Sequence, residues 1–386
     1  MSDKLRLGIV GVGNMGSSHL NSCKEGKLPE VELKAVCDIK PDRLEWAKEQ
    51  IPEIAIFDNY SDMLDSGLID AVVIATPHYF HPPMVKEALS KGIHAMSEKP
   101  AGVYTKAVRE LIEFSETQTA TYAIMFNQRT NCIYRKAKEL VSSGVYGDIR
   151  RVTWIITDWF RSQAYYDSGG WRATWDGEGG GVLMNQCPHQ LDLWQWICGM
   201  PSKVRAFCHN GKWHDIEVED DVTIYCEYPN GATGVFITTT GEAPGTNRLE
   251  ISLDKAKIIV ENGKVRVFEN EMKTSEFLVS AKDSFAHLHG EWHDIETDGQ
   301  NLQHEGVMNA FAAHILHGEP LVADGAEGIR GLTIANAAFL SSWLDDWVEL
   351  PIDEDLYLAE LNKRRATSKA KTNVVESVAG DMSSTF

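Results

Sequence analysis

Three polar side chains near the middle of the chain have the types and spacing that proton transfer needs. Asn185, His189 and Asp192 follow a run of three glycines (residues 179–181). If a helix begins near Gln186, the three side chains lie along one of its faces. A neutral imidazole accepts an alcohol proton near neutral pH, and a carboxylate one turn away can orient it. The spacing predicts His189 as the base and Asp192 as its orienting group. A histidine packed in the core is the alternative.

A lysine at the end of a second apolar segment is the next candidate. Residues 93–97 have the pattern of a buried strand that runs directly into Glu98-Lys99-Pro100. Parallel sheets bind ligands at the carboxyl ends of their strands, so the ammonium of Lys99 is expected at the rim of a cofactor cleft. A cationic nicotinamide ring beside it would lower the pKa of Lys99. Lys99 is predicted to hold and polarise a substrate oxygen, with a solvated surface lysine as the alternative.

The N-terminal stretch supplies the cofactor motif. An apolar run leads into Gly11, Gly13 and Gly16, at the spacing G-x-G-x-x-G, and a second apolar run ends at Asp38. Such a loop lets a pyrophosphate approach the free N–H groups of a helix N-terminus. A carboxylate at Asp38 accepts both ribose hydroxyls of NAD and repels the 2′-phosphate of NADP. The motif predicts NAD.

The cofactor contacts are expected from this loop and from the ends of the following strands. Arg43 is a complication, because a nearby arginine partly offsets the repulsion of a 2′-phosphate. The residues predicted to bind the cofactor are Gly11, Gly13, Asn14, Met15, Gly16, Asp38, Arg43, Thr76, Pro77, His81, Glu98, Lys99 and Asn127.

Aromatic and basic side chains are concentrated between residues 158 and 175. Sugar rings stack on aromatic faces, and arginine forks bind hydroxyls, carboxylates or sulfonates. Tyr165 and Tyr166 are further candidates for acid–base groups. Packing around a long loop is the alternative. The residues predicted to bind the substrate are Arg161, Tyr166, Trp171, Arg172, Trp175, Asn185 and His189.

The elements that position these residues belong to two patterns. Short apolar strands alternate with helices over residues 1–126, which predicts an α/β Rossmann domain with a doubly wound parallel sheet. Longer strands and the turns Asn230-Gly231 and Asn262-Gly263 predict a large, mostly antiparallel open sheet in an α+β domain over residues 127–362. This second domain is expected to bind substrate and to oligomerise. Residues 363–386 lack periodicity and are predicted to form a loose C-terminal tail.

Composition excludes several classes of function. The 386 residues carry a net charge of −19, which argues against nucleic acid and anionic membranes as partners. No apolar run is long enough to span a bilayer, and no leader sequence is evident, so a cytoplasmic protein is expected. Seven scattered cysteines without a C-x-x-C motif fit reduced thiols. His287, His289 and His293 lack partners at ligand spacing, so no metal site is predicted.

These motifs together resemble the glucose-fructose oxidoreductase / inositol dehydrogenase (Gfo/Idh/MocA) family, from Lys4 to about Leu350. The resemblance implies a Rossmann domain, a sheet domain that often oligomerises through its open face, and a tightly held nicotinamide cofactor. It also implies catalytic roles for Lys99 and His189 and a cis Lys99–Pro100 bond. Many relatives have an aspartate where this chain has Asn185. An amide bonds a sugar hydroxyl but does not take a proton.

The sequence thus predicts an NAD-dependent sugar or polyol dehydrogenase that removes hydride from a secondary hydroxyl of a sugar, cyclitol or glycoside. His189 would take the proton, Lys99 would hold the oxygen, and Asn185 and Asp192 would position substrate and base. A homo-oligomer, dimer or tetramer, is expected. Two alternatives stay open. One is an NAD-dependent glycosidase that cleaves a glycoside, anionic ones included, through a transient keto-sugar with the cofactor recycled. The other is a non-catalytic NAD-binding sensor.

Overall fold

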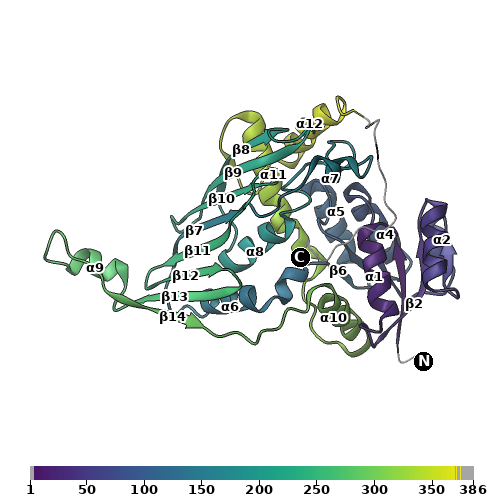
Figure 1. The fold of residues 1–386 in the computed structure, drawn as a ribbon, viewed down its shortest axis with the longest axis horizontal. Helices are drawn as coiled ribbons and strands as arrows, with labels where there is room; N and C mark the ends of the chain where they lie inside the picture. The colour runs from purple at the N-terminus through teal and green to yellow at the C-terminus, as the bar shows by residue number, and fades with distance from the viewer. Residues whose placement is uncertain (1–3, 370, 372–373, 375–386) are drawn as a thin grey trace.

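The computed structural model describes residues 4–369, 371 and 374, and it contains two sheets with helices packed around them (Figure 1). The first sheet is parallel throughout, in the order β3-β2-β1-β4-β5-β6. This is the doubly wound order, in which ligands bind where the order reverses, between β1 and β4. Its strands are β1 (Leu5–Val10), β2 (Val31–Cys37), β3 (Ala55–Phe57), β4 (Ala71–Ile74), β5 (His94–Ser97) and β6 (Tyr122–Ile124).

Helices connect these strands and cover both faces of the sheet. Apolar side chains of β1 and β4 are almost fully buried on both faces, as expected for a parallel sheet between helices. The helical elements are α1 (Asn14–Lys24), α2 (Pro41–Gln50), α3 (Tyr60–Asp65), η1 (His78–Phe80), α4 (His81–Ser90) and α5 (Thr105–Ser115). The predicted parallel sheet is confirmed.

The second sheet is mixed and has the order β14-β13-β12-β11-β7-β10-β9-β8-β15. Only the β7–β10 pair runs parallel among the described strands, and the two predicted hairpin turns join β9 to β10 and β12 to β13. Its strands are β7 (Ile149–Ile156), β8 (Lys203–Asn210), β9 (Glu219–Glu227), β10 (Thr233–Thr239), β11 (Asn247–Leu253), β12 (Ala256–Glu261), β13 (Lys264–Asn270), β14 (Gly290–Ile295) and β15 (Val348–Glu349). The predicted open, mostly antiparallel sheet is confirmed.

One face of this second sheet is covered by helices (Figure 1). Along β9 buried and half-buried residues alternate, so one face of that strand contributes to the core. Trp154, Trp194 and Phe236 pack together beneath the helices. The remaining helical elements are η2 (Asn127–Thr130), α6 (Cys132–Ser142), α7 (Gln163–Asp167), α8 (Pro188–Cys198), α9 (Thr274–Ser280), α10 (Gln303–His317), η3 (Gly325–Glu327), α11 (Gly328–Leu344) and α12 (Glu354–Arg365).

Helix α10 crosses from the second half of the chain back to the first sheet. Its buried residues Val307, Met308 and Phe311 share one hydrophobic cluster with Leu7 and Ile9 of β1. The first sheet is therefore completed by a helix that lies far along the sequence.

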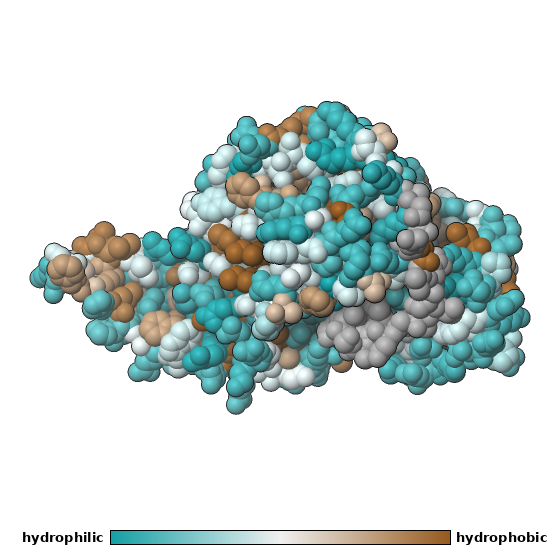
Figure 2. Space-filling model, turned by 45° about the horizontal axis from the view of Figure 1, so that its top comes forward, coloured by the Kyte–Doolittle hydropathy of each residue, from teal (hydrophilic) through white to brown (hydrophobic). Residues whose placement is uncertain are grey.

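An arm formed by α9 and the loop before β14 projects from the far end of the second sheet (Figure 1). It exposes the apolar side chains of Leu278, Val279 and Phe285, and the projecting end is largely hydrophobic in Figure 2. His287 and His289 are exposed there as well. Within the described residues, no three His, Cys, Asp or Glu side chains are grouped to hold a metal ion. The expected oligomer stays a prediction.

The C-terminal region differs from the predicted loose tail at its start. Residues 363–365 belong to α12, and Ser368 and Lys369 bond to the carboxylate of Glu217. Lys371 Nζ donates to the carbonyl of Tyr166 at 2.5 Å. The start of the predicted tail is therefore held by a helix and by side-chain contacts, although its sequence lacks periodicity. Residues 375–386 lie outside the described part. Of the helices described, none has the length and apolar character needed to cross a bilayer.

Candidate active site

The glycine loop after β1 leaves room for a ligand at its middle glycine. Gly11 adopts a φ of +84°, and a Cβ on Gly16 would lie 1.8 Å from the Gly11 carbonyl oxygen. A Cβ on Gly13 would meet nothing within 4 Å. The carboxylate of Asp38 accepts the Val12 N–H at 2.7 Å, which places it beside the loop. This open turn at the start of α1 fits the pyrophosphate and ribose of a dinucleotide.

The other residues predicted to bind the cofactor follow the carboxyl ends of strands of the first sheet. Asn14 and Met15 begin α1, Arg43 is in the first turn of α2, Thr76 and Pro77 follow β4, and Asn127 follows β6. His81 is fully buried, and its two ring nitrogens contact the carbonyls of Thr76 and Pro100 at 2.7 Å each. His81 therefore ties two loops together and has no free ring nitrogen for a cofactor, which differs from the prediction.

Glu98 lies at the end of β5, where its side chain turns toward α1. Its carboxylate contacts His19 Nε2 at 2.8 Å, and both side chains are buried. Burial raises the pKa of Glu98, but the hydrogen bond from His19 and the nearby His304 and Lys99 outweigh it and lower the pKa to about 2. A buried carboxylate is thus held ionised beside Lys99.

Lys99 extends from the end of the same strand toward the second domain. Its Nζ donates to the backbone carbonyl of Asn185 at 2.8 Å, and the Lys99–Pro100 bond is cis, as the family resemblance implies. Burial lowers the pKa of Lys99, while Glu98 and Glu178 counteract part of this effect. The pKa is lowered, as predicted, with burial as the first cause within the protein, and the effect of a neighbouring nicotinamide stays a prediction.

His189 lies in the first turn of α8, buried beside Lys99. Helix α8 begins at Pro188, close to the predicted start near Gln186, and Asn185 precedes the helix, so it does not share the helix face. Neither ring nitrogen of His189 has a hydrogen-bond partner among the described residues. Its ring packs edge-on against Phe126. Burial and then Lys99 lower the pKa of His189 well below its ordinary value, which keeps the imidazole neutral.

Asp192 does not contact His189, which differs from the predicted orienting role. Its carboxylate accepts two hydrogen bonds from Arg129, at 2.8 and 2.7 Å, and one from Gln195 at 2.9 Å. Arg129 also pairs with Glu327 at 2.8 Å. This buried network joins η2, α8 and η3, so Asp192 fixes the position of α8 and with it the backbone of His189.

A second network joins Asn185 to Glu178 and Tyr165. The Asn185 amide donates to the buried carboxylate of Glu178 and its carbonyl accepts from the Tyr165 hydroxyl at 3.3 Å. The same hydroxyl accepts from Arg172 Nη1 at 2.6 Å and from Gln186 Nε2 at 2.9 Å. Tyr165 is therefore the centre of a cluster that reaches the backbone holding Lys99.

Tyr166 and Trp175 occupy packed positions, unlike the predicted substrate-binding roles. The Tyr166 hydroxyl bonds to Thr240 at 2.7 Å, and burial raises its pKa. The Trp175 indole donates to the Glu217 carbonyl at 2.9 Å and packs against Phe339 and Trp343. Both side chains are thus engaged in packing and hydrogen bonds within the protein. Trp171 packs edge-on against the imidazole of His78.

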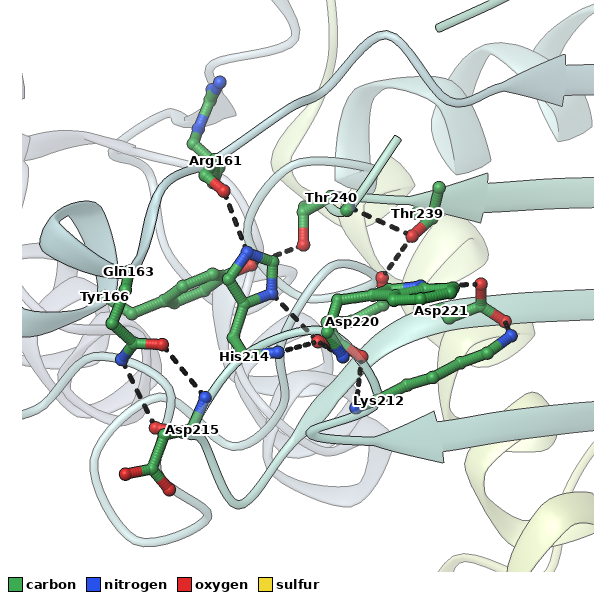
Figure 3. Close-up of polar contacts among 12 residues, drawn as sticks. Arg161, Gln163, Tyr166, Lys212, His214, Asp215, Asp220, Asp221, Thr239 and Thr240 are labelled. Carbon is green, nitrogen blue, oxygen red and sulfur yellow. Dashed lines mark hydrogen bonds and ion pairs between the residues drawn. The ribbon is translucent and has the colours of Figure 1, made fainter. Parts of the chain in front are cut away.

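Arg161 is presented by a loop that a histidine holds in place (Figure 3). His214 contacts the Arg161 carbonyl at 2.8 Å through Nε2 and Asp220 Oδ2 at 2.9 Å through Nδ1. Asp220 also accepts three backbone N–H groups from residues 212–214. The guanidinium of Arg161 points away from this cluster. The backbone of the loop is therefore fixed, while the guanidinium donates to the Phe160 carbonyl at 3.0 Å and lies over the Tyr165 ring.

Sequence reasoning missed Glu178, Arg129 and Glu219. Glu178 directly precedes the glycine run, and Arg129 lies shortly after β6. Their closeness in the sequence to predicted site residues was the only indication of a role at the site. Glu219 accepts the N–H groups of Gly181 and Leu183 at 2.8 and 2.9 Å, and a Cβ on Gly181 would lie 2.0 Å from the Glu219 carbonyl oxygen. Gly181 is therefore required because β9 approaches it so closely, whereas a Cβ on Gly179 would meet Val103 and one on Gly180 would meet Met184 and Phe339.

Comparison with known proteins agrees with this geometry. Residues 5–126 match the model of an oxidoreductase family with an NAD-binding Rossmann fold, and residues 134–259 match the GFO/IDH/MocA C-terminal domain. A dinucleotide loop joined to a buried lysine and histidine defines an NAD-binding oxidoreductase. The chain belongs to the GFO/IDH/MocA family.

Relatives of known name differ in what they act on. The chain is 27% identical to the rhizopine catabolism protein MocA of Rhizobium meliloti, over 60% of this chain and 70% of MocA. A glycosyl hydrolase family 109 protein of Shewanella baltica is 28% identical over 47% of this chain and 42% of its own length. The WlbA dehydrogenase of Bordetella pertussis, crystallised with NADH and UDP-GlcNAcA, is 26% identical with a TM-score of 0.76, covering 91% of this chain and all (100%) of WlbA.

Proposed function

We propose that this protein oxidises a secondary hydroxyl of a sugar, cyclitol or glycoside with NAD, or catalyses the reverse reduction. The observation that supports it most directly is His189, a buried imidazole whose two nitrogens have no partner among the described residues. Buried polar atoms are nearly always bonded, so a substrate hydroxyl is the expected partner. Lys99 lies within electrostatic reach of this ring.

Each of these residues has a separate role in the proposed reaction. Gly11, Gly13 and Asp38 hold the dinucleotide, which supplies the hydride acceptor when bound. Lys99 donates a hydrogen bond to the substrate oxygen and stabilises the negative charge that grows on it. His189 takes the hydroxyl proton, because its neutral form can accept one. Asn185 holds Lys99 through its carbonyl, and Asp192 positions α8.

Removal of either group tests this assignment. Lys99→Ala and His189→Ala are each expected to lower kcat on the order of a hundredfold to ten-thousandfold, with NAD affinity nearly unchanged. His209→Ala, at an exposed position of β8, is the matched control. Formation of reduced nicotinamide is followed over a panel of cyclitols, aldoses and glycosides. A loss below about tenfold in both variants contradicts the roles. Tight NAD binding without turnover of any member indicates a sensor.

Glycoside cleavage is a second candidate, supported by the hydrogen bonds at Tyr165. Two donors, Arg172 Nη1 and Gln186 Nε2, hold its hydroxyl oxygen in place, and this candidate assigns that oxygen the role of base. After oxidation at C3, such a base would remove the C2 proton while the C1–O bond breaks and the aglycone leaves as the alcohol. Water then adds at C1, and the returned hydride restores NAD.

Aryl glycosides distinguish the two candidates. The enzyme is incubated with NAD and the glycoside while reduced nicotinamide and released phenol are both followed. Dehydrogenation, which we favour, gives stoichiometric reduced nicotinamide without phenol. Sustained release of phenol on catalytic NAD, abolished by Tyr165→Phe, establishes cleavage instead.

A further inference from the structure

Three cationic side chains converge near the substrate position. The guanidinium groups of Arg172 and Arg161 lie 4.4 and 5.1 Å from the centre of the same aromatic ring, that of Tyr165. Both arginines lower the pKa of Lys99, so both charges lie within electrostatic reach of its ammonium. Two guanidinium groups thus lie over one aromatic ring, and the ammonium of Lys99 is within electrostatic reach of both.

Several polar atoms at this cluster lack partners. The buried Nε atoms of Arg161 and Arg172 have no hydrogen-bond partner among the described residues. The same holds for Nε1 of Trp159, whose ring lies under the Arg161 guanidinium, and for Oε1 of Gln186, whose amide bonds to Tyr165. Buried polar atoms of native proteins rarely stay unbonded. Their concentration here points to a polar ligand.

The nearby carboxylates also have partners other than these cations. Glu178 lies 3.7 Å from Arg172 Nη1 but is engaged by Asn185 and by the Ala173 N–H at 2.5 Å. Burial raises the pKa of Glu178, and the charge of Arg172 counteracts part of this effect. Glu98 is engaged by His19. A bound nicotinamide cation would add further positive charge beside Lys99, so a negatively charged ligand relieves the repulsion.

We propose that Arg161, Arg172 and Tyr165 form a binding site for an oxyanion on the sugar substrate, a carboxylate, phosphate or sulfonate. Guanidinium forks bind such groups through paired, charge-assisted hydrogen bonds, and the free Nε atoms supply the donors. Both guanidinium groups pack against the ring of Tyr165, which fixes the distance between them. This inference rests on the proposed oxidation of a sugar hydroxyl and specifies its substrate class.

The test measures binding of matched sugar pairs to the complex of full-length protein and NADH. Each neutral hexose is compared with its uronate, its 6-phosphate and its 6-sulfonate, and inorganic sulfate serves as a competitor without a ring. The anionic members are expected to bind about tenfold to a hundredfold more tightly than the neutral sugar. Arg161→Gln and Arg172→Gln are expected to remove this preference, while Arg151→Gln, an exposed residue of β7, is expected to keep it.

Three outcomes separate the inference from the proposed function. Preference for one oxyanion class that both arginine variants lose supports the inference and identifies the class. Equal binding of neutral and anionic sugars, or a preference that survives Arg161→Gln, overturns the inference even if the neutral sugar is oxidised. Arginine-dependent binding of anions, without reduced nicotinamide from any sugar, supports the anion site and overturns the proposed oxidation. Arg161 is half-buried, so its variant is informative if Arg172→Gln fails to fold.

Discussion

Asp38 is the residue that decides between the two nicotinamide dinucleotides. We expect tighter binding of NAD than of NADP, because a 2′-phosphate would meet this carboxylate. Asp38→Asn keeps an oxygen that can accept the Val12 N–H and removes the charge. The preference measured by calorimetry should fall at least about tenfold, which corresponds to about 1.4 kcal/mol. Asp42→Asn, an exposed residue of α2, is the control. Tighter binding of NADP by the unaltered protein would contradict the assignment.

Asn185 and Glu178 form a pair in which one amide faces one carboxylate. Asn185→Asp places two carboxylates together, and one of them must take a proton or repel the other. Both are protonated more easily at low pH, so the loss of unfolding free energy should grow as the pH rises, to about 1–3 kcal/mol.

A double variant in which the carboxylate and the amide exchange positions is the control for this pair. In Glu178→Gln/Asn185→Asp the glutamine oxygen accepts the Ala173 N–H and its amide donates to the new carboxylate. Stability measured by chemical denaturation at two pH values should recover in the double variant. A double variant that is no more stable than Asn185→Asp would show that the charge pair is not the cause.

At the scale of elements, β9 holds the glycine run through Glu219. Burial raises the pKa of Glu219 to about 8, from 4.5 in an exposed chain. Between these two values the folded protein holds a proton that the unfolded chain has released, so stability falls as the pH rises through this window, by up to about 1.4 kcal/mol per unit. Glu219→Gln should flatten this decline between pH 5 and 8. An unchanged slope in thermal or chemical unfolding would show that Glu219 stays ionised.

The loop that presents Arg161 depends on His214. Both partners of this ring, the Asp220 carboxylate and the Arg161 carbonyl, accept hydrogen bonds. His214→Ala removes both contacts, so KM for the substrate should rise roughly twofold to tenfold, with NAD affinity unchanged. The measurement is steady-state kinetics beside NAD calorimetry, with His209→Ala as control. A change confined to thermal stability would limit His214 to a structural role.

Local sequence patterns allowed the strands and helices to be predicted. The differences between predicted and observed side-chain roles arise from partners that lie far away in the sequence. The glycine loop, Asp38 and Lys99 are adjacent to buried strands, so apolar runs located them. The partner of Asp192 is Arg129, 63 residues earlier, and the partner of Trp175 is the Glu217 backbone. No spacing along the chain reveals such contacts, because they depend on how distant segments of the second domain pack against one another. Tyr165 and Tyr166 are adjacent in the sequence, and nothing in the sequence indicates that Tyr165 is the one that contacts the arginines.

At the scale of the whole molecule, the two halves of the chain share one hydrophobic cluster. Helix α10 lies in the second half but buries Val307, Met308 and Phe311 against the first sheet. Its exposed end also contacts the first half, where His317 Nε2 lies 2.6 Å from Glu30. The two halves are therefore joined by a buried apolar contact as well as by the active site.

Because the chain is synthesised from its N-terminus, the first sheet emerges before the helix that covers one of its faces. The ribosome releases β6 roughly 180 residues before α10, a delay of roughly 10 to 35 seconds at ordinary rates of translation. During that time the apolar face around Leu7 and Ile9 lacks its cover, and nascent chains in this state are natural clients for chaperones. A fragment that ends at Phe126 should therefore bind dyes that report exposed apolar surface, whereas the full chain should not. We therefore expect the nucleotide-binding half to need α10 in order to fold stably.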